Sequence, residues 1–191
     1  MSGTIRKLKF KKNNNSDLKN NSDLKNDSDL KNDSNSKNDP KTFVFIDASY
    51  FIFRRYCATQ VWYSRHTDKG TKDDCNIENE EFVAFFTKHF NDWISNIQKQ
   101  YKPDTIFWFK DAPKNSVWRM NLFETYKGHR DDLCPPHVSY FFKYSYEKLI
   151  PPDKLIFVPT AEADDSLAIS AKYENKTNPE NNIFVFTGDT D

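Results

Sequence analysis

The chain has 191 residues, enough for one ordinary domain, and its 28 Lys and Arg residues balance its 28 Asp and Glu residues. This neutrality excludes a protein that holds nucleic acid through bulk positive charge, although it leaves room for a local basic patch. We expect neither a membrane span nor a secretory signal, because no apolar run is long enough for the first and no apolar segment follows the basic residues near the N-terminus. The cysteines are few and scattered, which argues against a disulfide framework and predicts an intracellular protein.

The first 40 residues differ in composition from the rest of the chain. A six-residue unit, Asn-Ser-Asp-Leu-Lys-Asn, repeats between Asn15 and Asn32, and leucine is the only apolar residue in it. One leucine in six matches neither the helical nor the strand period and cannot offset the entropy lost on ordering. We therefore predict a disordered low-complexity tail at residues 1–40, in which the basic stretch at residues 5–12 is solvated, and a folded domain at residues 41–191.

The folded part opens with a strand and two helices. Residues 43–46 are wholly apolar, as is typical of a strand buried on both faces, and Asp47 follows them. Residues 49–56 then read as a helix, and the polar residues 59–78 are predicted to form a loop. Residues 80–101 form the clearest amphipathic helix, since a stripe of apolar side chains recurs at helical spacing and predicts a core face: Phe82, Phe86, Phe90, Trp93, Ile97 and Tyr101.

Three more apolar runs predict strands, at residues 105–109, 155–158 and 183–187. Helices are expected between them, at residues 115–125, at residues 135–149 and from Thr160 onward. Strands that alternate with helices imply an α/β fold, with a mostly parallel central sheet flanked by helices.

Acidic residues follow every predicted strand. In a parallel sheet, ligands bind outside the carboxyl ends of the strands, so these carboxylates are expected to meet at one edge. A single Asp there often caps a turn or a helix, but several carboxylates together repel one another unless a cation lies between them. Oxygen ligands without His or Cys suit a hard cation, Mg²⁺ or Mn²⁺. The predicted metal ligands are Asp47, Asp111, Glu162, Asp164, Asp165, Asp189 and Asp191.

The order of these motifs resembles the 5′-nuclease (flap endonuclease) family, most closely its bacterial polymerase-attached and phage branches. Residues 46–56 are similar to the family's opening, with Ala48 at its usual Gly position. Residues 109–130 carry a second Asp, then Trp118-Arg119, and a Tyr-Lys-x-x-Arg segment. Glu-Ala-Asp-Asp at residues 162–165 and Thr-Gly-Asp-x-Asp at residues 187–191 complete the set. Each motif alone is weak, but the ordered set is specific.

The resemblance implies a PIN-like 5′-nuclease fold and a divalent-metal-dependent 5′–3′ exonuclease or flap endonuclease that hydrolyses DNA during replication or repair. The carboxylates would hold two ions, one generating hydroxide and the other stabilising the departing 3′-oxygen. Lys127 and Arg130 would be catalytic, neutralising charge on the attacked phosphate, while Arg54 and Arg119 would contact other DNA phosphates. DNA with a flap or a 5′ end is the implied partner.

Family members continue beyond Thr-Gly-Asp-x-Asp into a helix-hairpin-helix region and a further metal-ligating Asp, which this sequence does not contain. The resemblance therefore predicts a domain truncated before that region, either a fragment or the first half of a split protein whose missing half a second chain supplies. Two alternatives remain open. A PIN-like ribonuclease uses a similar carboxylate edge, and a truncated remnant would serve only in DNA binding or assembly.

Overall fold

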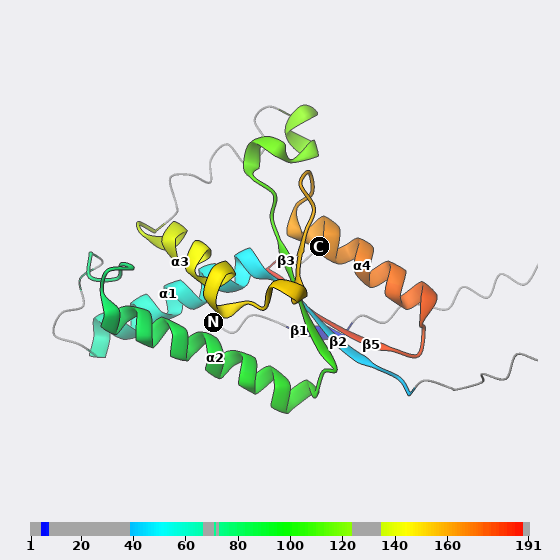
Figure 1. Cartoon of the computed structure of the whole chain (residues 1–191), viewed down its shortest axis with the longest axis horizontal. Helices are drawn as coiled ribbons and strands as arrows, with labels where there is room; N and C mark the ends of the chain where they lie inside the picture. The colour runs from blue at the N-terminus through cyan, green and yellow to red at the C-terminus, as the bar shows by residue number, and fades with distance from the viewer. Residues whose placement is uncertain (1–4, 8–38, 67–70, 72, 124–134, 189–191) are drawn as a thin grey trace, which may run out of the picture.

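The apolar runs form the strands of one five-stranded sheet in the order β1-β5-β2-β3-β4 (Figure 1). The structure is a computed structural model that describes residues 5–7, 39–66, 71, 73–123 and 135–188. Four strands pair in parallel, which confirms the predicted α/β class with a mostly parallel sheet: β2 (Thr42–Asp47), β3 (Thr105–Lys110), β4 (Leu155–Phe157) and β5 (Asn182–Phe186).

Helices cover both faces of the sheet. Side chains alternate along β2, so Val44 and Ile46 face the core under one group of helices, whereas Phe45 faces a second core formed with Ala163 and Leu167. Figure 1 shows the first group on one side of the sheet and a single helix on the other. The first group is α1 (Ala48–His66), α2 (Glu80–Tyr101) and α3 (Val138–Tyr144), and the single helix is α4 (Ala163–Thr177).

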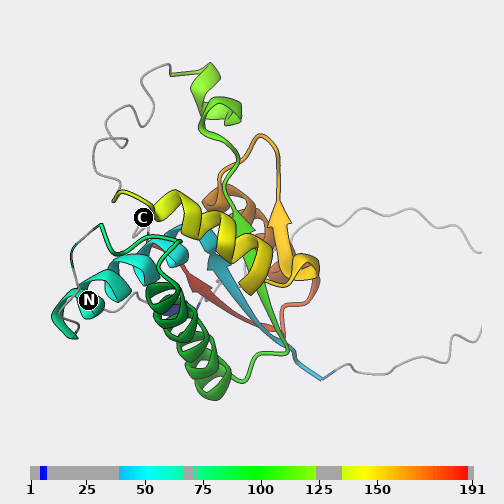
Figure 2. The ribbon, with the colours of Figure 1, turned by 60° about the vertical axis from the view of Figure 1, so that its left-hand side comes forward.

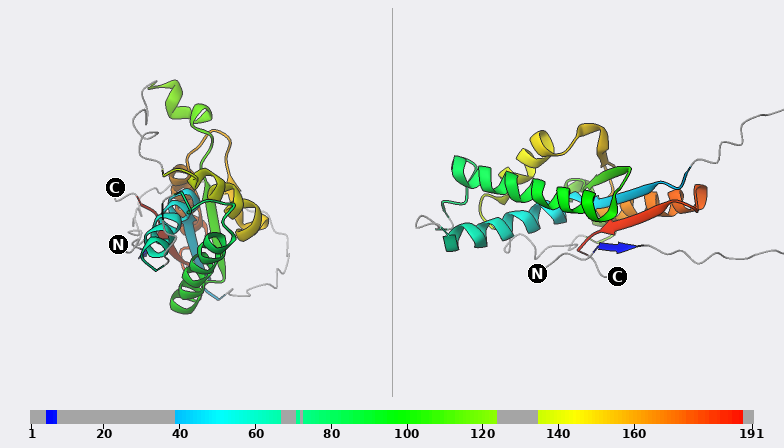
Figure 3. Two further views of the ribbon diagram at one scale, coloured as in Figure 1. Left: turned by 90° about the vertical axis from the view of Figure 1, so that its left-hand side faces the viewer. Right: turned by 90° about the horizontal axis from the view of Figure 1, so that it is seen from below.

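Aromatic rings fill the core between α1, α2 and the sheet. The Phe51 ring meets the Phe90 ring edge-on at 4.9 Å, Phe90 stacks on Trp108 at 5.5 Å, and Trp93 contacts Phe186 at 4.5 Å. The stripe predicted on α2 is therefore core packing. Figure 2 shows α3 beside α1 over the strands, and the right-hand view of Figure 3 shows α1 and α2 side by side, extending beyond the sheet.

The first helix is longer than predicted. A loop was expected from residue 59, but α1 continues to His66 because Thr59 and Tyr63 are buried against α2. The Thr59 hydroxyl donates to the Arg55 carbonyl at 2.8 Å, and the Tyr63 hydroxyl donates to Glu81 at 3.0 Å. Thr59 Oγ1 also lies 3.0 Å from His89 Nδ1, so contacts with α2 hold this polar segment in helical form. Residues 67–70 and 72 lie outside the described part of the chain.

Two further helices also differ from the sequence prediction. The expected helix at residues 115–125 is a pair of 3₁₀ turns, η1 (Lys114–Ser116) and η2 (Trp118–Asn121), separated by extended backbone at Val117. The expected helix at residues 135–149 begins only at Val138 and ends in a π-helical turn, η4 (Ser145–Leu149). A third 3₁₀ turn, η5 (Pro152–Lys154), leads into β4.

The tail contributes one strand that the sequence analysis did not predict. Strand β1 (Ile5–Lys7) pairs antiparallel with β5, and the right-hand view of Figure 3 shows the two strands side by side. The register sets Ile5 opposite Phe186. Residues 8–38 are outside the described residues. Across the described ranges, no helix combines the length and the apolar character that crossing a bilayer requires.

Candidate active site

Three carboxylates occupy the carboxyl edge of the sheet. Asp47 is the last residue of β2, Asp111 directly follows β3, and Asp164 is in the first turn of α4. Each is held by a neighbour: the Tyr50 amide donates to Asp47 Oδ1 at 3.0 Å, the Ala163 amide to Asp111 Oδ1 at 2.8 Å, and the Thr187 hydroxyl to Asp164 Oδ1 at 2.9 Å.

The electrostatics of Asp47 show that these three acids belong to one region. Only 8% of Asp47 is exposed, and burial raises the pKa of its carboxyl from 3.8 to about 7, even though the Tyr50 amide stabilises the charged form. The negative charges of Asp111 and Asp164 raise this pKa further. A second ionised carboxylate beside Asp47 is therefore costly without a cation.

The other two acids at the start of α4, Glu162 and Asp165, form ion pairs with Arg119. Arg119 donates from Nη1 to Glu162 Oε2 at 2.6 Å and from Nη2 to Asp165 Oδ1 at 2.6 Å, and the Trp118 ring nitrogen donates to Asp165 at 3.2 Å. Burial opposes ionisation of Asp165, but the Arg119 and Trp118 hydrogen bonds outweigh it and hold the pKa of Asp165 below its usual value. The acidic helix start thus divides its carboxylates between Arg119 and the group around Asp47.

Backbone hydrogen bonds explain why α4 begins later than predicted. Thr160 was expected to start the helix, but its carbonyl accepts the Trp118 amide at 2.9 Å and the Ala161 carbonyl accepts the Ala112 amide at 3.1 Å. Glu162 is the N-cap instead, in a capping box with Asp165. Figure 1 shows the light green η1–η2 segment projecting near the start of α4.

Of the remaining predicted site residues, only Arg54 lies in the part of the chain that the structure describes. Arg54 lies half-buried on α1, seven positions after Asp47. Lys127, Arg130, Asp189 and Asp191 lie outside the described residues, so their roles stay predictions.

The structure adds residues that sequence reasoning did not single out. Ser49 Oγ lies 3.1 Å from the hydroxyl of Tyr146, which belongs to the π-helical turn. Gly188 packs on Tyr50 so closely that a Cβ would lie 2.3 Å from its ring, which explains the glycine of Thr-Gly-Asp. The glycine was a recognisable motif position, but no sequence signal indicated Tyr146.

The carboxylates fit a hard cation in ligand type. Within the described ranges, no group of three or more Asp, Glu, His or Cys side chains is arranged so that it could hold a metal ion. Asp47, Asp111 and Asp164 nevertheless offer only oxygen atoms. The pKa of Asp47 is raised chiefly by burial and further by the charges of Asp111 and Asp164, and a divalent ion would favour the charged form of these carboxyls.

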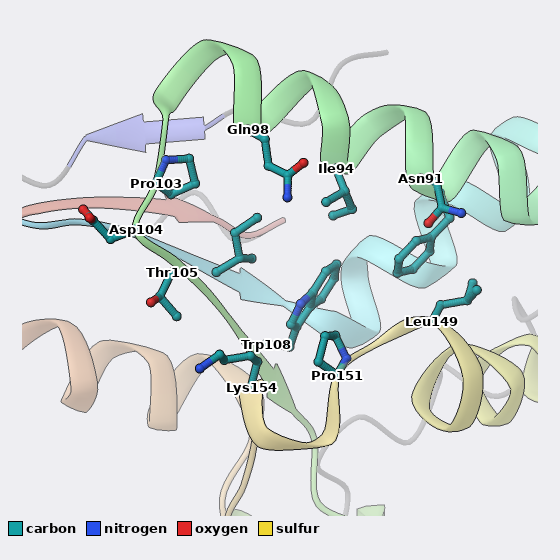
Figure 4. Close-up of a pocket in the computed structure, with 12 residues that line it drawn as sticks. Asn91, Ile94, Gln98, Pro103, Asp104, Thr105, Trp108, Leu149, Pro151 and Lys154 are labelled. Carbon is teal, nitrogen blue, oxygen red and sulfur yellow. The ribbon is translucent and has the colours of Figure 1, made fainter.

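A separate cavity of about 350 Å³ does not belong to this site (Figure 4). It lies between α2 and the amino-terminal half of β3, and residues around η5 close its other side. Asp104, on its rim, accepts the Thr42 amide at 2.7 Å and so has a structural role.

The mostly parallel sheet with acidic residues at its carboxyl edge places the chain in the class of α/β domains whose ligands bind at that edge. A comparison with protein families identifies the family within that class. The model of the 5′-3′ exonuclease N-terminal resolvase-like domain matches residues 42–191, and the chain belongs to this family. The resemblance inferred from the motifs is thereby confirmed, and with it a nuclease function in general terms. No curated protein matches the chain significantly.

Proposed function

We propose that this chain is a divalent-metal-dependent 5′–3′ exonuclease or flap endonuclease that hydrolyses phosphodiester bonds in DNA. The observation that carries the proposal is the convergence of Asp47, Asp111 and Asp164 at the carboxyl edge of the sheet, in a chain of the 5′-3′ exonuclease family. A buried Asp whose pKa is raised further by the charges of two other acids is a costly arrangement for a merely structural role.

The protein's own contribution is to place and hold oxygen ligands. Asp47, Asp111 and Asp164, with Asp189 and Asp191 after β5, would hold Mg²⁺ or Mn²⁺. Two such ions, when bound, supply a hydroxide nucleophile and stabilise the charge on the departing oxygen. The hydrogen bonds from Tyr50, Ala163 and Thr187 fix three of the carboxylates in advance, which lowers the cost of organising the site.

Arg119 sets a condition on the remaining predicted ligands. Its guanidinium holds both Glu162 and Asp165, so a metal ion at either carboxylate competes with Arg119. A DNA phosphate that binds Arg119 competes with the two carboxylates for its guanidinium. Lys127 and Arg130 are proposed to contact the attacked phosphate.

The test is cleavage of a labelled DNA with a single-stranded 5′ flap by the full chain, with Mg²⁺, with Mn²⁺ and with EDTA. We expect cleavage in either metal, none in EDTA, and a loss of at least about a hundredfold in Asp111→Asn, as for removal of a key electrostatic group. The matched control is Asp73→Asn, which removes the same charge from an exposed turn.

Two results would redirect the proposal. Faster cleavage of single-stranded RNA than of the DNA flap would favour the PIN-like ribonuclease. Metal-dependent DNA binding without cleavage would favour a binding or assembly role, in which a second chain completes the site; adding candidate chains and measuring cleavage again tests that role.

A further inference from the structure

Lys110 places a positive charge beside the acidic edge. It is the last residue of β3, immediately before Asp111, and its register partner on β4 is Phe157. The Lys110 ammonium lies over the Tyr146 ring, 4.4 Å from its centroid, and 5.6 Å from the centroid of the Phe157 ring. The Lys110 side chain therefore packs against two aromatic rings at the end of β3.

The Tyr146 ring is itself tied to the carboxylates. Its hydroxyl shares a hydrogen bond with Ser49, two positions after Asp47. Burial raises the pKa of Tyr146, and the charges of Asp111 and Asp47 raise it further, which indicates that the ring lies close to both acids. An ammonium group on this ring thus belongs to the same edge of the sheet.

Lys110 has no ion-pair partner among the described residues. Lys154, which also lies over a ring, pairs instead with Asp153 at 3.2 Å. An aromatic ring attracts a cation without neutralising it. Since an ammonium has three donors and the ring covers one side, donors remain for an incoming anion.

We propose that Lys110 binds a backbone phosphate of the nucleic acid at the carboxylate edge, with Tyr146 as the seat that holds its ammonium in place. This inference rests on the proposed nuclease function and adds a substrate contact to it. Seating the flexible side chain before the substrate arrives reduces the conformational entropy lost on binding. The partner is identified by its phosphodiester backbone, so the contact is independent of base sequence.

Binding measured without cleavage tests the contact. The full chain is titrated against a fluorescent DNA with a single-stranded 5′ flap in Ca²⁺, which occupies oxygen sites but has different geometric demands from Mg²⁺. We expect Lys110→Met to weaken binding about five- to tenfold near 50 mM salt and to lower the slope of log affinity against log salt by about 0.7 to 1. Lys110→Arg, which keeps the charge, should retain most of the affinity.

The control removes an identical charge elsewhere. Lys99→Met lies on the exposed face of α2 and should leave both affinity and salt slope close to the parent values. Thermal melting checks that each variant folds, and Lys110→Gln replaces Lys110→Met if the latter does not.

The outcomes separate the two proposals. If the parent binds and Lys110→Met and Lys110→Gln bind equally well with an unchanged salt slope, Lys110 has only a packing role, and the proposed nuclease function stands. If the parent neither binds nor cleaves the DNA, the proposed function fails and the Lys110 contact fails with it. A loss in Lys110→Met no larger than in Lys99→Met also overturns the assignment.

Discussion

Asp47 links the chemistry of the site to the stability of the fold. Its pKa is about 7 in the folded protein and 3.8 in the reference state, chiefly because burial disfavours the charge. Near pH 4 Asp47 changes the free energy of unfolding only slightly. As the pH rises toward 7, the unfolded chain releases this proton while the folded protein retains it, so Asp47 lowers the free energy of unfolding until the loss levels off above pH 7.

We therefore expect Asp47→Asn to stabilise the metal-free protein in a pH-dependent way. The gain should be close to zero near pH 4 and grow to a maximum of about 4 kcal/mol near pH 8, reduced by any relaxation around the site. Urea unfolding in EDTA at several pH values measures it, with the exposed Asp73→Asn as control. A difference from the parent that does not change with pH would contradict this account of Asp47.

At the residue scale, the sequence predicted which acidic residues meet at the edge of the sheet but not which of them pair with Arg119. Asp47 and Asp111 were predictable, because acids that follow strands of a parallel sheet must meet at one edge. The pairing of Arg119 with Glu162 and Asp165 was not, since it joins a 3₁₀ turn to a helix start more than forty positions away. Lys110 could not be predicted as part of the site, because the sequence does not show that its ammonium packs on the Tyr146 ring.

At the element scale, Arg119 joins η2 to the start of α4. Its side chain is 28% exposed, and its two-pronged contact with Asp165 is of the strong, charge-assisted kind. Removing it takes away the cation that Glu162 and Asp165 share. We expect Arg119→Leu to reduce the free energy of unfolding by about 2–3 kcal/mol.

Two further variants show whether geometry or charge is responsible. Arg119→Lys should recover only part of the loss, because an ammonium cannot bridge two carboxylates as a planar guanidinium does. Arg65→Leu, on an exposed turn of α1, should have little effect. Thermal and urea unfolding measure all three, and an Arg119→Leu variant as stable as Arg65→Leu would show that the ion pairs contribute nothing.

The elements themselves were predictable to different degrees, for physical reasons. Helix α2 was predicted at its observed bounds, because its apolar stripe is long and regular. Helix α1 was cut short because the residues after Ala58 look polar, and only the structure shows Thr59 and Tyr63 buried. The start of α4 was misplaced because backbone bonds from Ala112 and Trp118 hold Ala161 and Thr160 outside the helix.

At the scale of the whole molecule, metal binding should appear as added stability. An ion that binds only the folded state stabilises it by about 2.7 kcal/mol at a concentration of 100 times its dissociation constant. We expect millimolar Mg²⁺ at fixed ionic strength to raise the melting temperature of the parent more than that of Asp164→Asn. Asp92→Asn, on the exposed face of α2, should respond like the parent, and equal shifts in all three proteins would argue against a site at Asp164.

The strand order has a consequence for how the protein acquires its shape. The chain moves outward from β2 through β3 to β4, and then returns across the other face to set β5 beside β2, so that Phe43 pairs with Ile183, 140 positions later. Contacts between such distant segments form slowly, because a long loop must close before they contribute any stability. During synthesis, β2 must therefore wait with one edge unpaired until residues 182–186 emerge, and a partly made chain exposes an apolar strand that has still to meet its neighbour.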